Sequence, residues 1–149
     1  MRVLIELPTW LGDTIMTTPA IENIINYYKD LEITFVGSAV SIEALKNHPK
    51  VIEVIILDKK YKSLYTIYKK LGVFDIYFTF RGSFRAKLLR YFIKAKYNYQ
   101  FKKEKYPNRH QVEKYVDFIN DSLNINFSAG SLKINNPLIK NKASSKLLG

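Results

Sequence analysis

The chain opens with Arg2-Val-Leu-Ile-Glu-Leu-Pro-Thr-Trp-Leu-Gly-Asp13, a short apolar run that leads into a loop with one proline and one glycine. Runs of this length and composition are typical of buried parallel strands. Similar runs follow at Glu32–Val36, Glu53–Leu57 and Phe74–Thr79, and a weaker one at Tyr97–Phe101. The sequence therefore predicts a parallel strand at each of these positions.

Helical patterns separate the strands. In Thr14–Lys29 the apolar side chains of Ile21, Ile24 and Ile25 recur at the spacing of one helix face. Further helices are expected at Ser41–Lys46, Tyr61–Leu71, Ser83–Lys94 and Gln111–Leu123. In the helix at Ser83–Lys94, the side chains expected to face the core are Leu88, Leu89 and Phe92. This alternation predicts an α/β fold, a Rossmann-like parallel sheet with right-handed crossovers and helices on both faces.

Composition excludes several classes of protein. The chain has 149 residues, 47% of them hydrophobic, which suits one ordinary folded domain, and it has no cysteine for a disulfide framework or a Cys-based zinc site. Apolar runs stop well short of the roughly 20 residues that span a bilayer. No signal-peptide pattern follows Arg2, so we expect a cytoplasmic protein.

The net charge of +11 is concentrated in one segment. Residues 1–80 carry nine basic and nine acidic side chains, whereas residues 81–114 carry eleven basic side chains against Glu104 and Glu113. Such asymmetry indicates a surface that faces an anionic partner, for example nucleic acid, phospholipid headgroups or a phosphorylated sugar. A composition biased by AT-rich coding is the alternative explanation for part of the lysine excess.

The periodicity fades after residue 123. Asn124–Lys146 is rich in Asn, Ser and Lys, which predicts a linker, and Leu147-Leu148-Gly149 resembles the start of a further strand. We therefore expect a domain over residues 1–123, and a linker with the first residues of another domain over 124–149.

The loop after the first strand is the natural ligand site of such a sheet, because ligands bind beyond the carboxyl ends of the strands. It holds only Gly12, not the glycine patterns of dinucleotide or phosphate loops, and the chain has no D-x-D pair for a metal–diphosphate clamp. Asp13 suits either a helix N-cap or a functional carboxylate. Trp10 suits a core anchor, which its residue type alone favours, or a platform for a sugar. Thr18-Pro19 suits a kink or a helix start.

Three segments together resemble one family. Arg2–Ile21, with its Trp-Leu-Gly-Asp form, closely resembles the opening of the lipopolysaccharide heptosyltransferases of glycosyltransferase family nine, and the heptosyltransferase II branch most of all. Phe78–Ala86 is similar to the loop after the fourth strand in that family. Arg109–Tyr115 is similar to its His-x-[VAM]-E-[RK]-Tyr segment. The resemblance extends in order over nearly the whole chain.

The resemblance implies the N-terminal, acceptor-binding half of a GT-B glycosyltransferase, whose C-terminal half binds ADP-heptose. Family members invert the configuration of the sugar, so a base must take the proton of the acceptor hydroxyl. Asp13 matches the family's Gly-Asp motif and is the expected base. The expected acceptor-binding residues are Thr9, Trp10, Gly12, Arg81, Ser83, Arg85, Arg109 and His110. His110 also suits a cap of the last helix. Neither a metal ion nor a cofactor is expected.

The expected acceptor, a Kdo-lipid A core, is anionic, and arginine forks match its phosphates and carboxylates. The Lys- and Tyr-rich stretch Tyr91–Tyr106 suits either a solvated surface or contact with the anionic cytoplasmic face of the inner membrane. A basic nucleic-acid-binding module is the alternative function, but no recognised binding motif is present and the first half of the chain is neutral, so nucleic acid is not expected. We expect residues 1–149 alone to lack transferase activity.

Overall fold

The computed structural model describes residues 1–57 and 71–132, apart from the side chains of Phe84 and Arg85. The helix expected at Tyr61–Leu71 lies outside the described residues except for Leu71. The same holds for residues 133–149 of the expected linker and strand start. Residues 125–132 contain neither helix nor strand.

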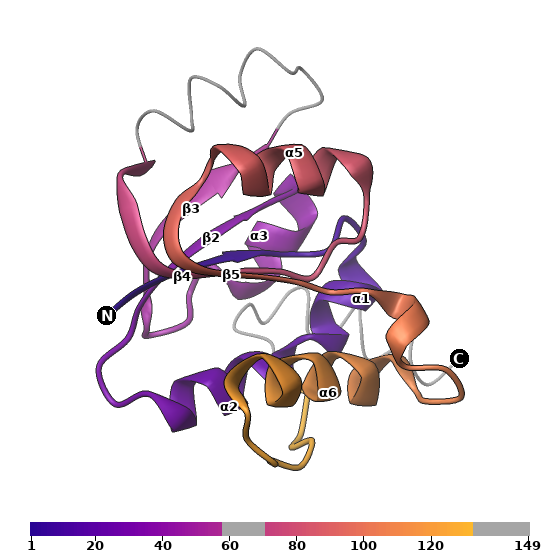
Figure 1. The fold of residues 1–149 in the computed structure, drawn as a ribbon. Helices are drawn as coiled ribbons and strands as arrows, with labels where there is room; N and C mark the ends of the chain where they lie inside the picture. Colours follow the sequence, from indigo (N-terminus) through magenta and orange to yellow (C-terminus); the bar gives the residue numbers. More distant parts are fainter. Residues whose placement is uncertain (58–70, 133–149) are drawn as a thin grey trace.

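Five parallel strands form one sheet in the order β3-β2-β1-β4-β5, as Figure 1 shows. They are β1 (Arg2–Glu6), β2 (Glu32–Gly37), β3 (Val51–Ile56), β4 (Val73–Thr79) and β5 (Lys94–Gln100). The three strands at the centre are almost entirely buried, as their continuous apolar sequences require. The strand order reverses beside β1, and ligands of open α/β sheets bind at such a point. The expected fold class is confirmed.

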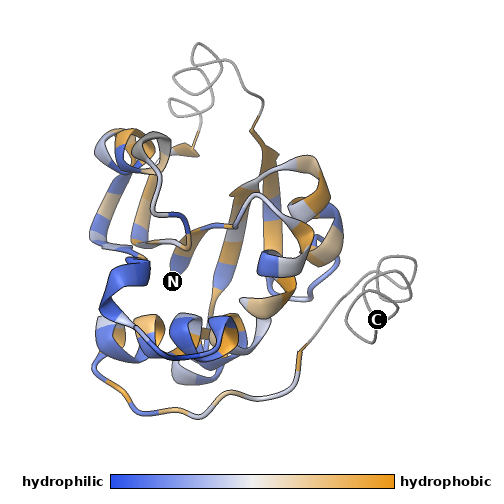
Figure 2. Ribbon diagram, turned by 90° about the vertical axis from the view of Figure 1, so that its right-hand side faces the viewer, coloured by the Kyte–Doolittle hydropathy of each residue, from blue (hydrophilic) through white to orange (hydrophobic). Residues whose placement is uncertain are grey.

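Helices cover both faces of the sheet. The face below the sheet in Figure 1 packs against α2 (Thr18–Tyr27) and α6 (Gln111–Leu123), and α5 (Phe84–Phe92) covers the opposite face. The short helices α1 (Leu11–Met16) and α3 (Ala39–Leu45) belong to the same side as α2. Figure 2 shows hydrophobic residues gathered in the strands, with hydrophilic residues on much of the flanking helices.

The first predicted helix is two helices. Helix α1 begins at Leu11, three residues earlier than predicted, and ends at Met16. Helix α2 begins at Thr18, so Thr17 separates the two helices. Pro19 explains the break because it has no N–H to donate to the carbonyl of Ile15. The hydroxyl of Thr18 donates to that carbonyl instead, at 2.7 Å. Of the two interpretations of Thr18-Pro19, the helix start agrees better with the structure. The N-cap is Thr17, one residue earlier than the expected Thr18.

The boundary between α5 and β5 also differs from the prediction. The helix ends at Phe92 and the strand begins at Lys94, so both the helix end and the strand start lie earlier than expected. Leu89 is buried as predicted, but Leu88 is only half-buried and Phe92 is 39% exposed. The prediction for Phe92 is wrong because Ile93, the residue that caps the helix, fills that place in the core.

Aromatic side chains fill the space between β4, β5 and α6. Phe78, Phe80, Phe101 and Phe118 form edge-to-face pairs with ring centroids 5.6 to 6.3 Å apart, a favoured geometry. Helix α6 begins and ends where predicted. This packing fixes the position of α6 beside the carboxyl ends of the strands.

No helix in the described ranges, 1–57 and 71–132, is long and apolar enough to cross a membrane.

Candidate active site

Hydroxyl groups hold the loop after β1 in place. The hydroxyl of Ser41 donates to the carbonyl of Pro8 at 2.5 Å, and that of Ser38 donates to the carbonyl of Thr9 at 2.8 Å. The hydroxyl of Thr14 donates to the carbonyl of Trp10 at 2.9 Å and lies 2.8 Å from the Ser41 oxygen. These bonds satisfy the carbonyls of Pro8 and Thr9, which belong to no strand or helix, and so stabilise the loop.

Asp13 is the third residue of α1, so its interpretation as a helix N-cap is wrong. The N-cap is Trp10, whose side chain makes no capping hydrogen bond. The Asp13 carboxylate is half-buried and makes no hydrogen bond or ion pair within the described residues. Burial, the largest cause, raises the pKa of Tyr115 of α6 to about 12; a hydrogen bond with Gln111 acts in the opposite direction, and the negative charge of Asp13 contributes a smaller increase. An unengaged carboxylate at the mouth of the sheet is free to accept a proton.

The backbone around Asp13 is open. A Cβ atom added to Gly12 would meet nothing within 4 Å in the described part of the chain, so packing within the protein does not require glycine there. Trp10 is 72% exposed, which shows that its interpretation as a core anchor is wrong. The hydroxyl-bonded loop turns this side chain outward. Thr9 is exposed beside it.

Arg81 follows β4 and lies over a buried carboxylate that the sequence interpretation missed. Glu6 is fully buried; its Oε1 accepts hydrogen bonds from the hydroxyls of Thr79 (2.5 Å) and Tyr77 (3.2 Å), and its Oε2 lies 3.8 Å from Arg81 Nη1. Burial and the Glu6 charge raise the pKa of Tyr77 well above its ordinary value. A glutamate within an apolar strand was the signal that could have revealed this cluster.

Ser83 and Arg85 lie at the start of α5. The Ser83 side chain caps the helix by accepting a hydrogen bond from the backbone N–H of Ala86 at 3.2 Å, which gives it a structural role. The backbone of Arg85 lies in the first turn of α5, and its side chain lies outside the described residues.

Arg109 and His110 lie at the start of α6. Arg109 makes a two-pronged bond to Asp117, at 3.0 and 3.2 Å, and lies 3.5 Å from Glu113. The hydrogen bond to Asp117 and the negative charge of Asp117 raise the pKa of Arg109. The Arg109 guanidinium is therefore already engaged. His110 occupies the N-cap position of α6, as predicted for a cap, but its side chain makes no capping hydrogen bond.

A basic hollow of about 510 Å³ opens next to Arg81, at the ends of β4 and β5. It is lined by Phe80, Gly82, Lys87, Gln100, Phe101, Lys102, Lys103 and Glu104. Sequence analysis placed these lysines in the basic segment but did not single them out. No group of His, Asp or Glu in the described residues could hold a metal ion.

The five-stranded parallel sheet with helices on both faces is a Rossmann-like fold that matches the N-terminal half of GT-B heptosyltransferases. Solved structures support this fold. A glycosyltransferase family 9 protein from Veillonella parvula superposes with a TM-score of 0.76 at 21% identity, over 90% of this chain and 44% of its own. E. coli ADP-heptose LPS heptosyltransferase II superposes with a TM-score of 0.69 at 16% identity, over 100% and 51%.

Sequence similarity identifies the family. Lipooligosaccharide heptosyltransferase 2 of Campylobacter jejuni, serotype O:2, is 40% identical over the whole chain and 49% of its own length. No family model matches. The chain is therefore similar to the N-terminal half of a family nine heptosyltransferase, which confirms the resemblance in its motifs. It spans about half the length of the curated relatives that it matches.

Proposed function

We propose that this chain is the acceptor-binding half of an ADP-heptose:lipopolysaccharide heptosyltransferase, with Asp13 as the general base. The observation that carries the proposal is the Asp13 carboxylate, which is half-buried at the mouth of the sheet and unengaged within the described residues. The similarity to a lipooligosaccharide heptosyltransferase supports the choice of reaction.

The reaction is a single displacement. Asp13 takes the proton of the acceptor hydroxyl while the hydroxyl oxygen forms a bond to the anomeric carbon of the heptose. The bond from that carbon to the ADP oxygen breaks on the opposite face, and ADP carries away its electron pair. The configuration at the anomeric carbon therefore inverts. The second half of the enzyme holds the donor, so both halves must close for the geometry that gives the rate.

The acceptor is an inner-core glycolipid of the Kdo-lipid A type, which is anionic. Arg81 and the lysines of the adjoining hollow supply positive charge at the carboxyl ends of β4 and β5. We propose that Arg85 also binds the anionic acceptor. Thr9, Trp10 and Gly12 offer an exposed surface beside Asp13 for the sugar. Ser83, Arg109 and His110 are included on the family resemblance alone, because Ser83 caps α5 and Arg109 is engaged by Asp117 and Glu113. The enzyme works at the cytoplasmic face of the inner membrane, where the lipid is anchored.

The test joins this chain to the C-terminal half of the Campylobacter relative and supplies ADP-heptose with Kdo-lipid A. We expect a product heavier than the acceptor by one heptose residue in a mass spectrum. The intact relative is the positive control. A fusion that binds ADP-heptose as well as the relative does, yet transfers no heptose to any inner-core acceptor, would contradict the proposal.

A further inference from the structure

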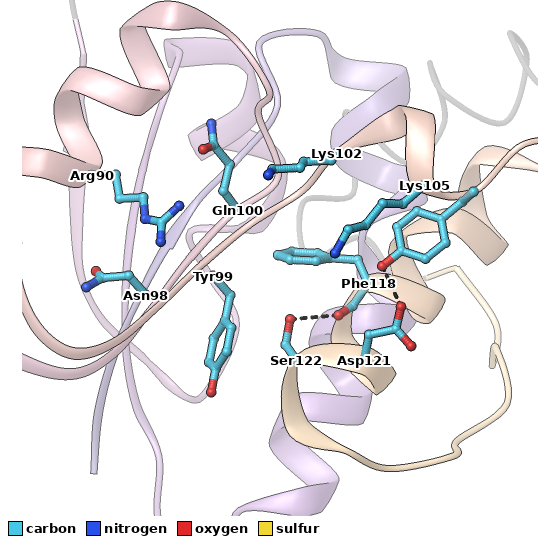
Figure 3. A pocket seen from close by; sticks show the side chains of 10 residues that line it. Arg90, Asn98, Tyr99, Gln100, Lys102, Lys105, Phe118, Asp121 and Ser122 are labelled. Atoms are coloured by element: carbon cyan, nitrogen blue, oxygen red, sulfur yellow. Dashed lines mark hydrogen bonds between the residues drawn. The ribbon is translucent and has the colours of Figure 1, made fainter.

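A second basic hollow wraps around the outer edge of β5, away from Asp13. Its volume is about 250 Å³, which suits a single sugar or a small group rather than a drug-sized ligand. Figure 3 shows that the charged ends of Arg90, Lys102 and Lys105 all point toward the hollow. These side chains come from α5, from the turn after β5 and from η1 (Lys103–Lys105), so the fold brings them together.

The three cations have no anionic partner in the described residues, where none of them makes an ion pair. The one acidic group in the lining, Asp121, already accepts a hydrogen bond from the Tyr106 hydroxyl at 2.7 Å; in Figure 3 it lies on the same side of the hollow as Lys105 and opposite Arg90. Unpaired cations that converge on a concave surface favour a doubly charged group such as a phosphoryl group.

The floor of the hollow is aromatic and rigid. The Tyr99 ring stacks on Phe78 with centroids 5.4 Å apart, and Phe118 packs edge-to-face on the same ring at 6.3 Å. Aromatic faces of this kind cover the apolar face of a sugar ring.

We propose that this hollow binds a phosphorylated sugar, with the phosphoryl group between Arg90, Lys102 and Lys105 and the sugar ring over Tyr99. The hollow shares Gln100 and Lys102 with the hollow beside Arg81, so this site borders the candidate active site. The proposal does not depend on the transfer reaction.

Binding of glucose 6-phosphate, glucose and inorganic phosphate to the 149-residue chain tests the proposal, measured by calorimetry at one ionic strength. We expect glucose 6-phosphate to bind more tightly than either fragment. Arg90→Ala and Lys105→Ala should each weaken its binding about tenfold, as expected for loss of one charge-assisted hydrogen bond.

Lys94→Ala is the matched control, because Lys94 is exposed on the same strand and lies outside the lining. Vesicles that carry lipid A, with its phosphorylated glucosamines, distinguish the two sources of the ligand. If phosphorylated but not dephosphorylated lipid A displaces glucose 6-phosphate, the sugar belongs to a glycolipid; if neither does, it is a soluble metabolite. Equal weakening by Lys94→Ala and Arg90→Ala, or glucose 6-phosphate binding no tighter than inorganic phosphate, would overturn the site.

Discussion

Asp13 owes its accessibility to its position inside a helix. A carboxylate at the N-cap would accept bonds from the helix backbone, whereas at the third position of α1 its oxygens make no bond within the described residues. A general base must be free to receive a proton, and the position of Asp13 satisfies this condition.

Asp13→Asn, in a protein that contains both halves, should reduce heptose transfer by roughly 10² to 10⁴ and leave acceptor binding largely intact, because an amide cannot take the hydroxyl proton. Initial rates at saturating substrate, with acceptor binding measured separately, check this. An Asn variant with near-normal turnover would limit Asp13 to a structural role.

Arg81→Lys should weaken binding of the Kdo-lipid A acceptor because an ammonium group cannot form the two-pronged contact of a guanidinium. The conservative change keeps a cation beside buried Glu6, so the fold should survive. Acceptor binding should weaken roughly tenfold if one charge-assisted bond is lost. Lys29→Ala, an exposed charge before β2, is the control. If both variants bind alike, the basic excess is a general surface property, and tighter binding of an oligonucleotide at the same salt would favour the nucleic-acid alternative.

The residue-level predictions succeeded or failed for physical reasons. The sequence indicated that Asp13 follows closely after β1, because a short motif fixes its place, but not that it lies in the first turn of α1. It did not indicate that Trp10 is exposed, since a tryptophan suits the core as well as a sugar platform. Glu6 was missed because only tertiary packing brings it to Tyr77, Thr79 and Arg81.

Elements of regular structure were predictable where hydrophobic periodicity was continuous. Helix α6 matches its predicted bounds because its apolar residues recur without interruption. The break at Thr17 was not predicted, because an apolar pattern runs across it and only the missing N–H of Pro19 reveals it. Strand β5 begins three residues early, since Lys94 and Lys96 on an exposed edge hide the strand pattern.

Ser41→Ala should destabilise the loop between β1 and α1. The Ser41 hydroxyl is buried and donates to the carbonyl of Pro8, and its loss leaves buried polar groups unsatisfied at a cost of about 1 to 3 kcal/mol. Chemical denaturation measures the change in free energy of unfolding. Ser122→Ala is the comparison, because its hydroxyl bonds only within its own helix. Equal stability of the two variants would show that the loop does not depend on Ser41.

The whole molecule should lose stability at alkaline pH. Burial raises the pKa of Tyr115 from 10.0 to about 12, and burial also raises the pKa values of Tyr77 and Tyr106. Between pH 10 and pH 12 Tyr115 loses its proton in the unfolded chain and keeps it in the folded chain. The contribution of Tyr115 to stability is therefore complete below pH 10 and is lost as the pH rises toward 12. The melting temperature should fall over this range, and less steeply for Tyr115→Phe. An unchanged melting temperature would contradict the assigned burial.

At the scale of the whole molecule, we propose that the acceptor and the donor bind to different halves of the enzyme. The fold places the open carboxylate and the basic hollow at one edge of the sheet, which suits an acceptor. The glycine patterns that hold a nucleotide diphosphate are absent from the loop after β1. We therefore expect this half to bind the acceptor and not the donor.

Calorimetric titration of the 149-residue chain with Kdo-lipid A and, separately, with ADP-heptose tests this claim most directly. We expect saturable binding of the acceptor, weakened by added salt, and no detectable binding of ADP-heptose. One-to-one binding of ADP-heptose in the micromolar range, with no binding of Kdo-lipid A, would contradict it and place the donor site in this half.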